Sequence, residues 1–392
     1  MKVMVAMDSF KGSLSAAAAC AAAAAGIHDC DPTAEVCVLP LSDGGEGLLA
    51  ALRPVLPPDR WREVTVPVRG PYGRDAVCTI LTDGTAAIIE LAQCCGLLLQ
   101  EPQARDCKLA SSYGLGQALA HALALGCTDI RLGLGGSATN DGGAGFAQAL
   151  GARFYDRSGR LLTHPLCGLD LAELGRIDTG ALNPALRRAR ICGCCDVSHG
   201  LLGSQGATMV FGPQKGASAS DLELLEQGMS HYAALLQEAF GRDLTEVPGA
   251  GAAGGLGVAV LHFCGGQLRP GIDTVLDLLG FEELLQGSDL LLTGEGQLDE
   301  QSARGKVVSG VARRARARDV TVVAMGGSLG PGAGALHAQG VTAMFAISRG
   351  PMTCAQSMAE AAALLRQGAC SVMAVFAAGS RAGDGTRPPR GR

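Results

Sequence analysis

The fold is decided by VMVAMDSFKGS, residues 3–13, in which a short apolar run is followed at once by a polar loop. The alanine-rich segment 16–25 comes next and is expected to form a helix. The same order of strand, loop and helix begins again at VCVLPL (36–41), and it returns late in the chain at DLLLTGEG (289–296). Strands that alternate with helices predict a parallel sheet with right-handed crossovers.

The middle of the chain follows a different pattern. REVTVPV (62–68), GRDAVCTIL (73–81) and TAAIIEL (85–91) are separated by the turn signals GPYG and TDG. Short alternating strands joined by such turns predict an antiparallel meander. Because this meander interrupts the parallel pattern, we expect one domain to be inserted into another.

The predicted fold class is therefore α/β, with two domains of ordinary size in 392 residues. A parallel α/β/α domain, discontinuous in sequence, is expected to occupy residues 1–62 and 289–375. An inserted α/β domain that contains the antiparallel meander is expected over residues 63–288. The tail at 380–392 has no apolar periodicity, so we expect it to be disordered.

The composition argues against several classes of partner. The net charge of −5 disfavours nucleic acid and acidic membranes, both of which attract basic surfaces. Many of the fifteen cysteines lie inside apolar runs, where they behave as small hydrophobic residues. The stretch CGCC (192–195) contains one CxxC pair, but with only His199 nearby it lacks the further ligands that zinc requires. No run approaches the ~18 apolar residues of a membrane span. We therefore expect a cytoplasmic protein with no nucleic-acid or membrane partner.

A second unusual stretch, LGLGGSATNDGGAG (132–145), is rich in glycine. Glycine loses more conformational freedom on folding than any other residue, so a cluster of glycines needs a local reason. We interpret the stretch as a loop whose backbone approaches an anionic group. It also fits part of the dinucleotide pattern G-x-G-x-x-G/A, although it does not open directly into a helix. A nicotinamide-dependent enzyme therefore remains an alternative.

Several polar side chains follow the predicted parallel strands directly. Ligands of a parallel sheet bind beyond the carboxyl ends of its strands, so these loops are expected to gather at one edge. A lysine, several carboxylates and free backbone N–H groups suit the phosphates of a magnesium-bound nucleotide. The residues concerned are Asp8, Ser9, Lys11, Asp43, Glu295 and Asp299.

Each of the leading candidates also has a simpler interpretation. Lys11 could be a solvated surface lysine, and Asp43 could cap a helix N-terminus. Asp196, which follows an apolar strand, is a candidate base for a substrate hydroxyl but could instead form a turn with its own backbone. Lys215 carries the same ambiguity as Lys11.

Taken together, the motifs point to a known family. The stretches that carry the likeness are DSFKGSLSA, PLSDGGEG, GLGGSATNDGGAG, CDV, FGPQKGA, GAGAAGGLG, PGIDTVLDLLGFEELL, TGEGQLDEQS and GKVVSGVA. In this order, from Asp8 to about Ala312, the chain resembles the type I glycerate kinases, which phosphorylate D-glycerate with ATP and Mg²⁺. A weaker likeness continues to about Leu365. The resemblance implies a flavodoxin-like α/β domain and an inserted α/β domain, with the active site in the cleft between them.

The resemblance implies ATP-dependent phosphorylation of D-glycerate to 2-phosphoglycerate in that cleft. The alternatives are a glycerate 3-kinase that gives 3-phosphoglycerate, and an NAD(P)-dependent hydroxy-acid dehydrogenase. We expect Lys11, Asp196 and Lys215 to be catalytic, and Glu295 and Asp299 to bind the metal. The residues expected to bind substrate or phosphate are Ser9, Ser13, Asp43, Gly44, Gly45, Gly135, Gly136, Ser137, Asn140 and Asp141. The resemblance leaves a homodimer open.

The chain departs from the family pattern after CDV. Ser198, His199 and Gly200 stand where Thr-Asn-Pro is expected. His199 thus lies three residues after the candidate base Asp196, a change that bears on substrate preference and pH dependence.

Overall fold

The computed structural model describes residues 1–384, and their side chains up to residue 380. The chain divides into two compact units. Unit 1 consists of Met1–Asp43 together with the chain from Val275 onward, and unit 2 consists of Gly44–Thr274. Both are α/β, which confirms the predicted fold class.

In the structure, the boundaries between the two units lie at 43/44 and 274/275. Both lie earlier in the chain than the domain boundaries expected from the sequence, 62/63 and 288/289. Local packing explains both differences. The short helix α2 (Leu48–Leu52) packs on β5 (Ala86–Glu90) of unit 2, and the carboxylate of Glu90 accepts hydrogen bonds from the backbone of Gly47 and Leu49. At the other boundary, Arg314 of unit 1 binds the carboxylates of Asp277 and Glu282.

Unit 1 is built on a five-stranded sheet, and all of its neighbouring strands are parallel, as predicted. The strand order is β13-β12-β11-β1-β2. The strands are β1 (Lys2–Met7), β2 (Glu35–Pro40), β11 (Leu290–Leu298), β12 (Thr321–Leu329) and β13 (Ala343–Ala346). Residues 3–7 pair with residues 290–294 in adjacent central strands, so the two distant stretches that predicted the sheet pair directly with each other.

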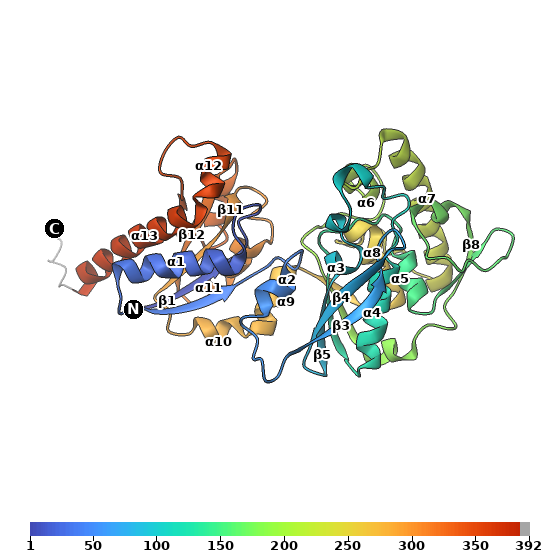
Figure 1. Ribbon diagram of the computed structural model, residues 1–392, viewed down its shortest axis with the longest axis horizontal. Coiled ribbons are helices and arrows are strands. Elements are labelled where there is room, and N and C mark those ends of the chain that lie inside the picture. The colour runs from blue at the N-terminus through green and yellow to red at the C-terminus, as the bar shows by residue number, and fades with distance from the viewer. Residues whose placement is uncertain (385–392) are drawn as a thin grey trace, which may run out of the picture. The chain divides into compact units, whose positions relative to one another are not determined.

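Helices cover both faces of this sheet. α1 lies beside α13 (Figure 1), and both pack on the face that carries Val3 and Val5. α11 packs on β11 and β12 with residues outside that cluster. α1 starts at the N-cap Ser15, whose hydroxyl accepts a hydrogen bond from the Ala18 backbone at 3.2 Å. The longer helices of unit 1 are α1 (Ala16–Cys30), α11 (Val307–Arg316) and α13 (Ala361–Asp384); the short ones are α10 (Phe281–Leu285) and α12 (Cys354–Ala359).

The C-terminal helix differs from two sequence-based expectations. α13 extends through Asp384, so residues 380–384 are helical where we expected disorder, while residues 385–392 lie outside the described part of the chain. By length and composition, the segment Ala361–Ser380 is also apolar enough to cross a membrane. Its apolar side faces the core of unit 1, where Leu364 and Leu365 are buried, and Arg366 binds Asp29 of α1.

Unit 2 contains a six-stranded mixed sheet in the order β10-β9-β6-β5-β4-β3. β3, β4 and β5 form the predicted antiparallel meander, and β5, β6, β9 and β10 are parallel to one another. The strands are β3 (Arg62–Arg69), β4 (Asp75–Thr82), β5 (Ala86–Glu90), β6 (Asp129–Gly133), β9 (Arg190–Cys194) and β10 (Gln267–Arg269). A separate antiparallel pair joins β7 (Arg153–Asp156) to β8 (Leu174–Asp178).

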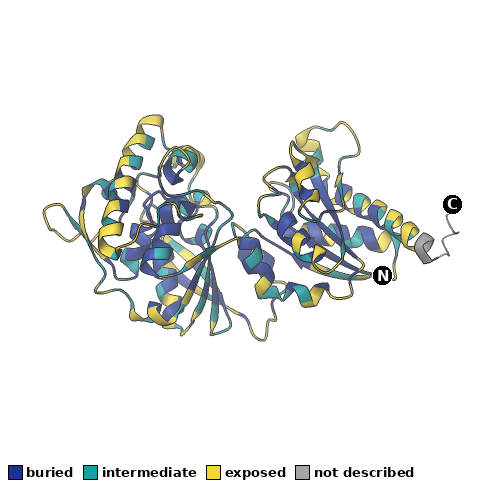
Figure 2. Ribbon diagram, turned by 180° about the vertical axis from the view of Figure 1, so that it is seen from behind, coloured by how far each residue is buried: buried dark blue, intermediate teal, exposed yellow. Residues whose placement is uncertain are grey.

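The helices of unit 2 pack around one hydrophobic core, whose largest members include Tyr232, Phe146 and Phe154. Buried residues concentrate on the strands and on the inner sides of the helices, while outer turns are exposed (Figure 2). The helices are α3 (Leu91–Cys95), α4 (Tyr113–Ala124), α5 (Ala144–Ala149), α6 (Ala207–Phe211), α7 (Ala219–Phe240) and α8 (Ala252–Phe263). α9 (Gly271–Leu279) carries the chain out of unit 2.

Candidate active site

The polar edge of unit 1 begins where β1 ends. The Asp8 backbone N–H donates to the Gly294 carbonyl at 2.9 Å, so the loop after β1 stays attached to β11. This attachment brings Asp8 and Glu295 to the same edge of the sheet, and both residues are only 8% exposed. The Asp8 carboxylate accepts a hydrogen bond from the Ser9 backbone at 2.6 Å.

The carboxylates at this edge destabilise one another's charge. Burial, with repulsion from Asp43 and Glu295, raises the pKa of Asp8 to about 7, although Lys11 opposes the shift. Burial also raises the pKa of Glu295. Glu295 Oε1 is buried and has no hydrogen-bond partner among the described residues. Buried carboxylates normally have partners, so this edge has the electrostatic character of a cation site.

The two residues predicted to bind the metal differ in their surroundings. Glu295 has a buried carboxylate oxygen that accepts no hydrogen bond from the described residues. In contrast, Asp299 Oδ1 accepts hydrogen bonds from the backbone of Gln301 and Ser302, at 2.8 and 3.2 Å. Within residues 1–384, no three His, Cys, Asp or Glu side chains gather as a metal site. Magnesium requires only one or two protein carboxylates when phosphates supply its other ligands. Sequence reasoning placed Asp8 at this edge but omitted it from the metal ligands; its position directly after a buried strand was the available signal.

Lys11 is exposed in the loop that follows Asp8. A Cβ atom built on Gly296 would lie 3.4 Å from the Lys11 backbone nitrogen, so the loops after β1 and β11 lie against each other. Ser13, predicted to bind phosphate, donates its hydroxyl to the Met358 carbonyl at 2.7 Å. Lys11 thus presents a solvated positive charge at the edge that holds the buried carboxylates.

In unit 2 the glycine-rich loop approaches the chain's own backbone. A Cβ on Gly133 would lie 2.6 Å from the Gly44 carbonyl oxygen, and a Cβ on Gly135 would lie 2.4 Å from the Gly45 Cα. Both distances are shorter than any van der Waals contact allows. We interpreted these glycines as making room for an anion; in the structure they make room for residues 44–45.

The polar side chains of this loop point inward. Ser137 is 7% exposed, and Asn140 and Asp141 are fully buried. Asp141 accepts hydrogen bonds from the Ser112 backbone and hydroxyl, at 2.8 and 2.6 Å, and from the backbone of Gly143 and Gly145. Burial raises the pKa of Asp141, although these four donors oppose the shift. Asp141 therefore fastens the loop to the start of α4.

Lys215 is also buried, at 3% exposure. Its ammonium group donates to the Ser137 hydroxyl at 2.9 Å and to the Thr139 carbonyl at 2.8 Å. Burial lowers the pKa of Lys215 to about 8, while the nearby acidic groups, including Asp141, oppose this shift. Lys215 therefore holds the glycine-rich loop in place through hydrogen bonds to Ser137 and Thr139.

Asp196 lies two residues beyond the carboxyl end of β9 and is half-buried. Its Oδ1 atom accepts a hydrogen bond from the Gly271 backbone, at 2.9 Å, in the first turn of α9. The Gly271 backbone donor thus fixes the orientation of Asp196. The ring of the nearby His199 packs edge-on against Phe211, with 5.0 Å between the ring centroids.

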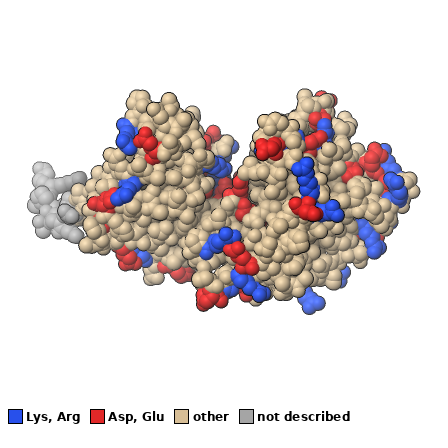
Figure 3. All heavy atoms as spheres, viewed as in Figure 1, with Lys and Arg blue, Asp and Glu red and all other residues tan. Residues whose placement is uncertain are grey.

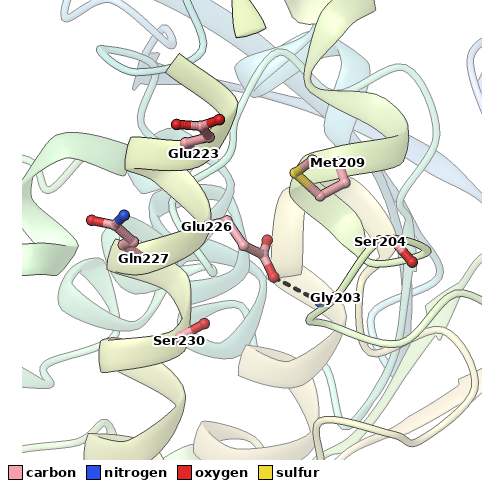
Figure 4. A pocket seen from close by; sticks show the side chains of 7 residues that line it. All are labelled: Gly203, Ser204, Met209, Glu223, Glu226, Gln227 and Ser230. Atoms are coloured by element: carbon pink, nitrogen blue, oxygen red, sulfur yellow. Dashed lines mark hydrogen bonds between the residues drawn. The ribbon is translucent and has the colours of Figure 1, made fainter. Parts of the chain in front are cut away.

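A surface pocket of about 590 Å³ lies elsewhere in unit 2, beside α6 and α7. Figure 4 shows its lining, in which Glu226 accepts a hydrogen bond from the Gly203 backbone at 2.7 Å. Met209 contributes an apolar wall, and none of the predicted site residues lines this pocket.

Comparison with known proteins identifies the family. The profile of the glycerate kinase family matches residues 3–377, which is nearly the whole chain. The chain belongs to the glycerate kinase family. It is accordingly a phosphotransferase with an alcohol group as acceptor. The resemblance carried by the sequence motifs is thus confirmed.

Individual glycerate kinases support this assignment over most of their lengths. The chain is 39% identical to the glycerate kinase of Bacillus subtilis (strain 168), with 95% of this chain and 97% of the relative covered. It is 40% identical to the glycerate 2-kinase of Escherichia coli (strain K12), covering 88% and 90%. A crystal structure described as that of a glycerate kinase 2 from Salmonella typhimurium LT2 has a TM-score of 0.82 and 38% identity. That match covers 97% of this chain and 99% of the other.

Proposed function

We propose that this member of the glycerate kinase family transfers the γ-phosphoryl group of ATP to the 2-hydroxyl of D-glycerate. The choice of position 2 is supported by the similarity to the glycerate 2-kinase of Escherichia coli, which extends over 349 residues. The choice of a magnesium-bound nucleotide is supported by the buried carboxylates of unit 1.

The edge of unit 1 fits a divalent cation. Glu295 offers a buried carboxylate oxygen without a partner, and Asp8 is held beside it against mutual repulsion. We infer that Glu295 and Asp8 hold Mg²⁺, that Asp43 adds negative charge nearby, and that Asp299 orders the adjoining turn. When bound, Mg²⁺ supplies positive charge that neutralises the phosphates of the nucleotide.

The chemical step requires one base and one mobile cation from the chain. The substrate hydroxyl attacks the γ-phosphorus and gives its proton to the carboxylate of Asp196, while the bond to the bridging oxygen breaks and ADP leaves. The Gly271 hydrogen bond holds Asp196 in a fixed orientation for this role. The exposed ammonium group of Lys11 neutralises charge on the transferring group, as such transfer depends mainly on positioning and electrostatics.

Lys215 and the glycine-rich loop have a supporting role in this proposal. Because Lys215 is held by Ser137 and Thr139, it acts on the reaction through the loop and does not contact the phosphoryl group. Gly136, which is exposed and has a φ of +73°, remains a candidate for backbone contact with a substrate. Ser9 and the partly buried Gly45 keep their predicted roles as parts of phosphate-binding loops.

ADP release distinguishes the reaction classes. The purified protein with D-glycerate, ATP and Mg²⁺ is expected to release ADP in a glycerate-dependent manner. A hydroxy-acid dehydrogenase would instead change absorbance at the nicotinamide band with D-glycerate and NAD(P)⁺, without ADP. A non-catalytic nucleotide-binding protein would gain thermal stability from ATP and Mg²⁺ but form no phosphoglycerate. Either of these results would contradict the proposal. A cytoplasmic location and a homodimeric assembly stay predictions.

A further inference from the structure

The cysteine motif CGCC has no part in the proposed reaction. Cys192 and Cys194 lie two residues apart on β9 and therefore face the same side of the sheet. Cys194 is buried, whereas Cys192 is half-buried. The first turn of α9 packs over this side, because Thr274 Oγ1 lies 3.9 Å from Cys192 Sγ.

Each strand beside β9 carries an arginine near Cys192. Arg131 is its direct neighbour on β6, and on β10 Arg269 pairs with Cys194. Arg131 Nη2 binds Asp129 at 3.1 Å, but its Nη1 atom is buried with no hydrogen-bond partner among the described residues. Guanidinium groups beside a partly accessible thiol favour the thiolate, which is the reactive form of cysteine.

We propose that Cys192 is a reactive thiolate and a site of reversible modification by small disulfides of the glutathione class. The Cys192 thiolate attacks one sulfur of the disulfide, and a new S–S bond forms between the protein and that half. The S–S bond of the reagent breaks, and its other half leaves as a thiolate, so atoms and electrons balance.

The electrostatics of the neighbouring groups agree with this assignment. The pKa of Cys192 is lowered, chiefly through its interaction with the neighbouring Cys194 thiol. Thr274, Arg269 and Arg131 lower it further, whereas burial raises it. The pKa of Cys194 is raised well above its usual value by the same interaction and by burial. Because Cys194 is buried and Cys192 is only half-buried, Cys192 is the accessible thiol of the pair and the nucleophile.

Modification of Cys192 has a direct route to Asp196. A group attached to Sγ crowds Thr274, which belongs to the same helical turn as Gly271. Gly271 donates the backbone hydrogen bond that holds Asp196. Displacement of this turn removes the hydrogen bond, so we expect the modified enzyme to lose turnover. This consequence depends on the proposed role of Asp196, whereas the reactivity of Cys192 does not.

Peptide mapping of the full-length protein tests the reactivity. The reduced protein is treated with oxidised glutathione at pH 7, and adducts are located by mass spectrometry over time. Cys192 is expected to react several-fold faster than Cys354, which is the exposed cysteine and serves as the internal control. Arg131→Gln should slow Cys192 several-fold and leave Cys354 unchanged. Modification of Cys354 with Cys192 left untouched, or an Arg131→Gln variant with unchanged selectivity, would overturn the proposal.

Turnover measured on the same samples tests the coupling to Asp196. The Cys192 adduct should reduce glycerate-dependent ADP release, dithiothreitol should restore it, and Cys192→Ser should be active and insensitive to the reagent. Full modification of Cys192 with unchanged turnover would refute the coupling. If the unmodified protein released no ADP at all, the proposed function would fail, and the peptide map would still decide the reactivity of Cys192.

Discussion

Asp8 is a residue whose charge the folded protein disfavours. Its carboxylate is buried and is repelled by the carboxylates of Asp43 and Glu295, and the positive charge of Lys11 offsets only part of the resulting rise in its pKa. A fold tolerates such a group where function requires it, because each buried charge without full compensation costs stability. The proposal that Asp8 and Glu295 bind Mg²⁺ therefore has consequences for stability as well as for activity.

Asp8→Asn should change the pH dependence of stability. The pKa of Asp8 is raised to about 7 in the folded protein, so the folded state holds a proton that the unfolded state releases near pH 4. The wild-type free energy of unfolding should therefore fall as the pH rises from 5 to 8, with Asp8 accounting for about 2–3 kcal/mol. The asparagine variant lacks this contribution. Urea unfolding at both pH values, without metal, makes the comparison; parallel pH profiles would count against the assignment.

Substitutions of the two candidate lysines should have different effects on turnover and on stability. Lys11→Ala removes an exposed charge, so we expect turnover to fall by orders of magnitude with an unchanged melting temperature. Lys215→Met removes two hydrogen bonds made by a buried ammonium group, and we expect a loss of about 2–4 kcal/mol of stability together with activity. Turnover at saturating substrate and urea unfolding of both variants provide the test. Near-wild-type turnover of Lys11→Ala would remove it from the mechanism.

At the scale of elements, the glycine-rich loop depends on a kink in α8. The helix is interrupted at Ala253, Gly254 and Gly255, all of which have positive φ. The Gly254 carbonyl accepts a hydrogen bond from Gly142 at 3.0 Å. The ideal Cβ position at Gly254 is 2.0 Å from the Thr139 carbonyl oxygen, the same oxygen that accepts from Lys215. The kink and the loop thus form one packed unit.

Gly254→Ala should disrupt this packing. The added methyl group must displace the Thr139 carbonyl and also adopt a φ of +68°, so we expect a loss of about 3 kcal/mol. Ala253→Gly is the matched control, because it relieves an alanine at φ +54° and should be neutral or stabilising by up to about 1 kcal/mol. Urea unfolding measures both variants. Wild-type stability of Gly254→Ala would show that the loop does not need this close approach.

Local sequence patterns were sufficient to predict the elements but not the packing of their loops. The apolar runs at 3–7 and 289–296 predicted strands of one parallel sheet, because burial on both faces leaves a readable pattern. Only the structure shows that these two strands are adjacent. The same kind of pattern identified the glycines of 132–145 but did not reveal which residues pack against them. What lies against Gly133 and Gly135 is a segment about ninety residues earlier in the chain, which no local pattern reveals. The burial of Lys215 likewise depends on Ser137, 78 residues away.

At the scale of the whole molecule, each unit contributes a different kind of group to the proposal. Unit 1 supplies the buried carboxylates and Lys11. Unit 2 supplies Asp196 and the glycine-rich loop to which Lys215 is hydrogen-bonded. Charged side chains of both signs are scattered over the surface seen in Figure 3, with wide neutral areas between them. Together with a net charge of −5, this distribution means that anionic substrates must be held by a few local groups.

The family could be predicted from sequence because nine stretches occur in one order, whereas the roles of single residues could not. Asp8 and Asp299 both follow strand ends, yet only the structure shows that Asp8 is repelled by its neighbours and that Asp299 caps a turn. Such differences arise from burial and from hydrogen-bond partners, which a motif does not encode.

The central claim, ATP-dependent phosphorylation of D-glycerate at position 2, is tested most directly by phosphorus NMR of the product. The purified protein is incubated with D-glycerate, ATP and Mg²⁺, and the phosphoglycerate formed is compared with authentic 2- and 3-phosphoglycerate. We predict a single new resonance that coincides with 2-phosphoglycerate, accompanied by an equal amount of ADP. Formation of 3-phosphoglycerate, or consumption of no ATP, would contradict the account.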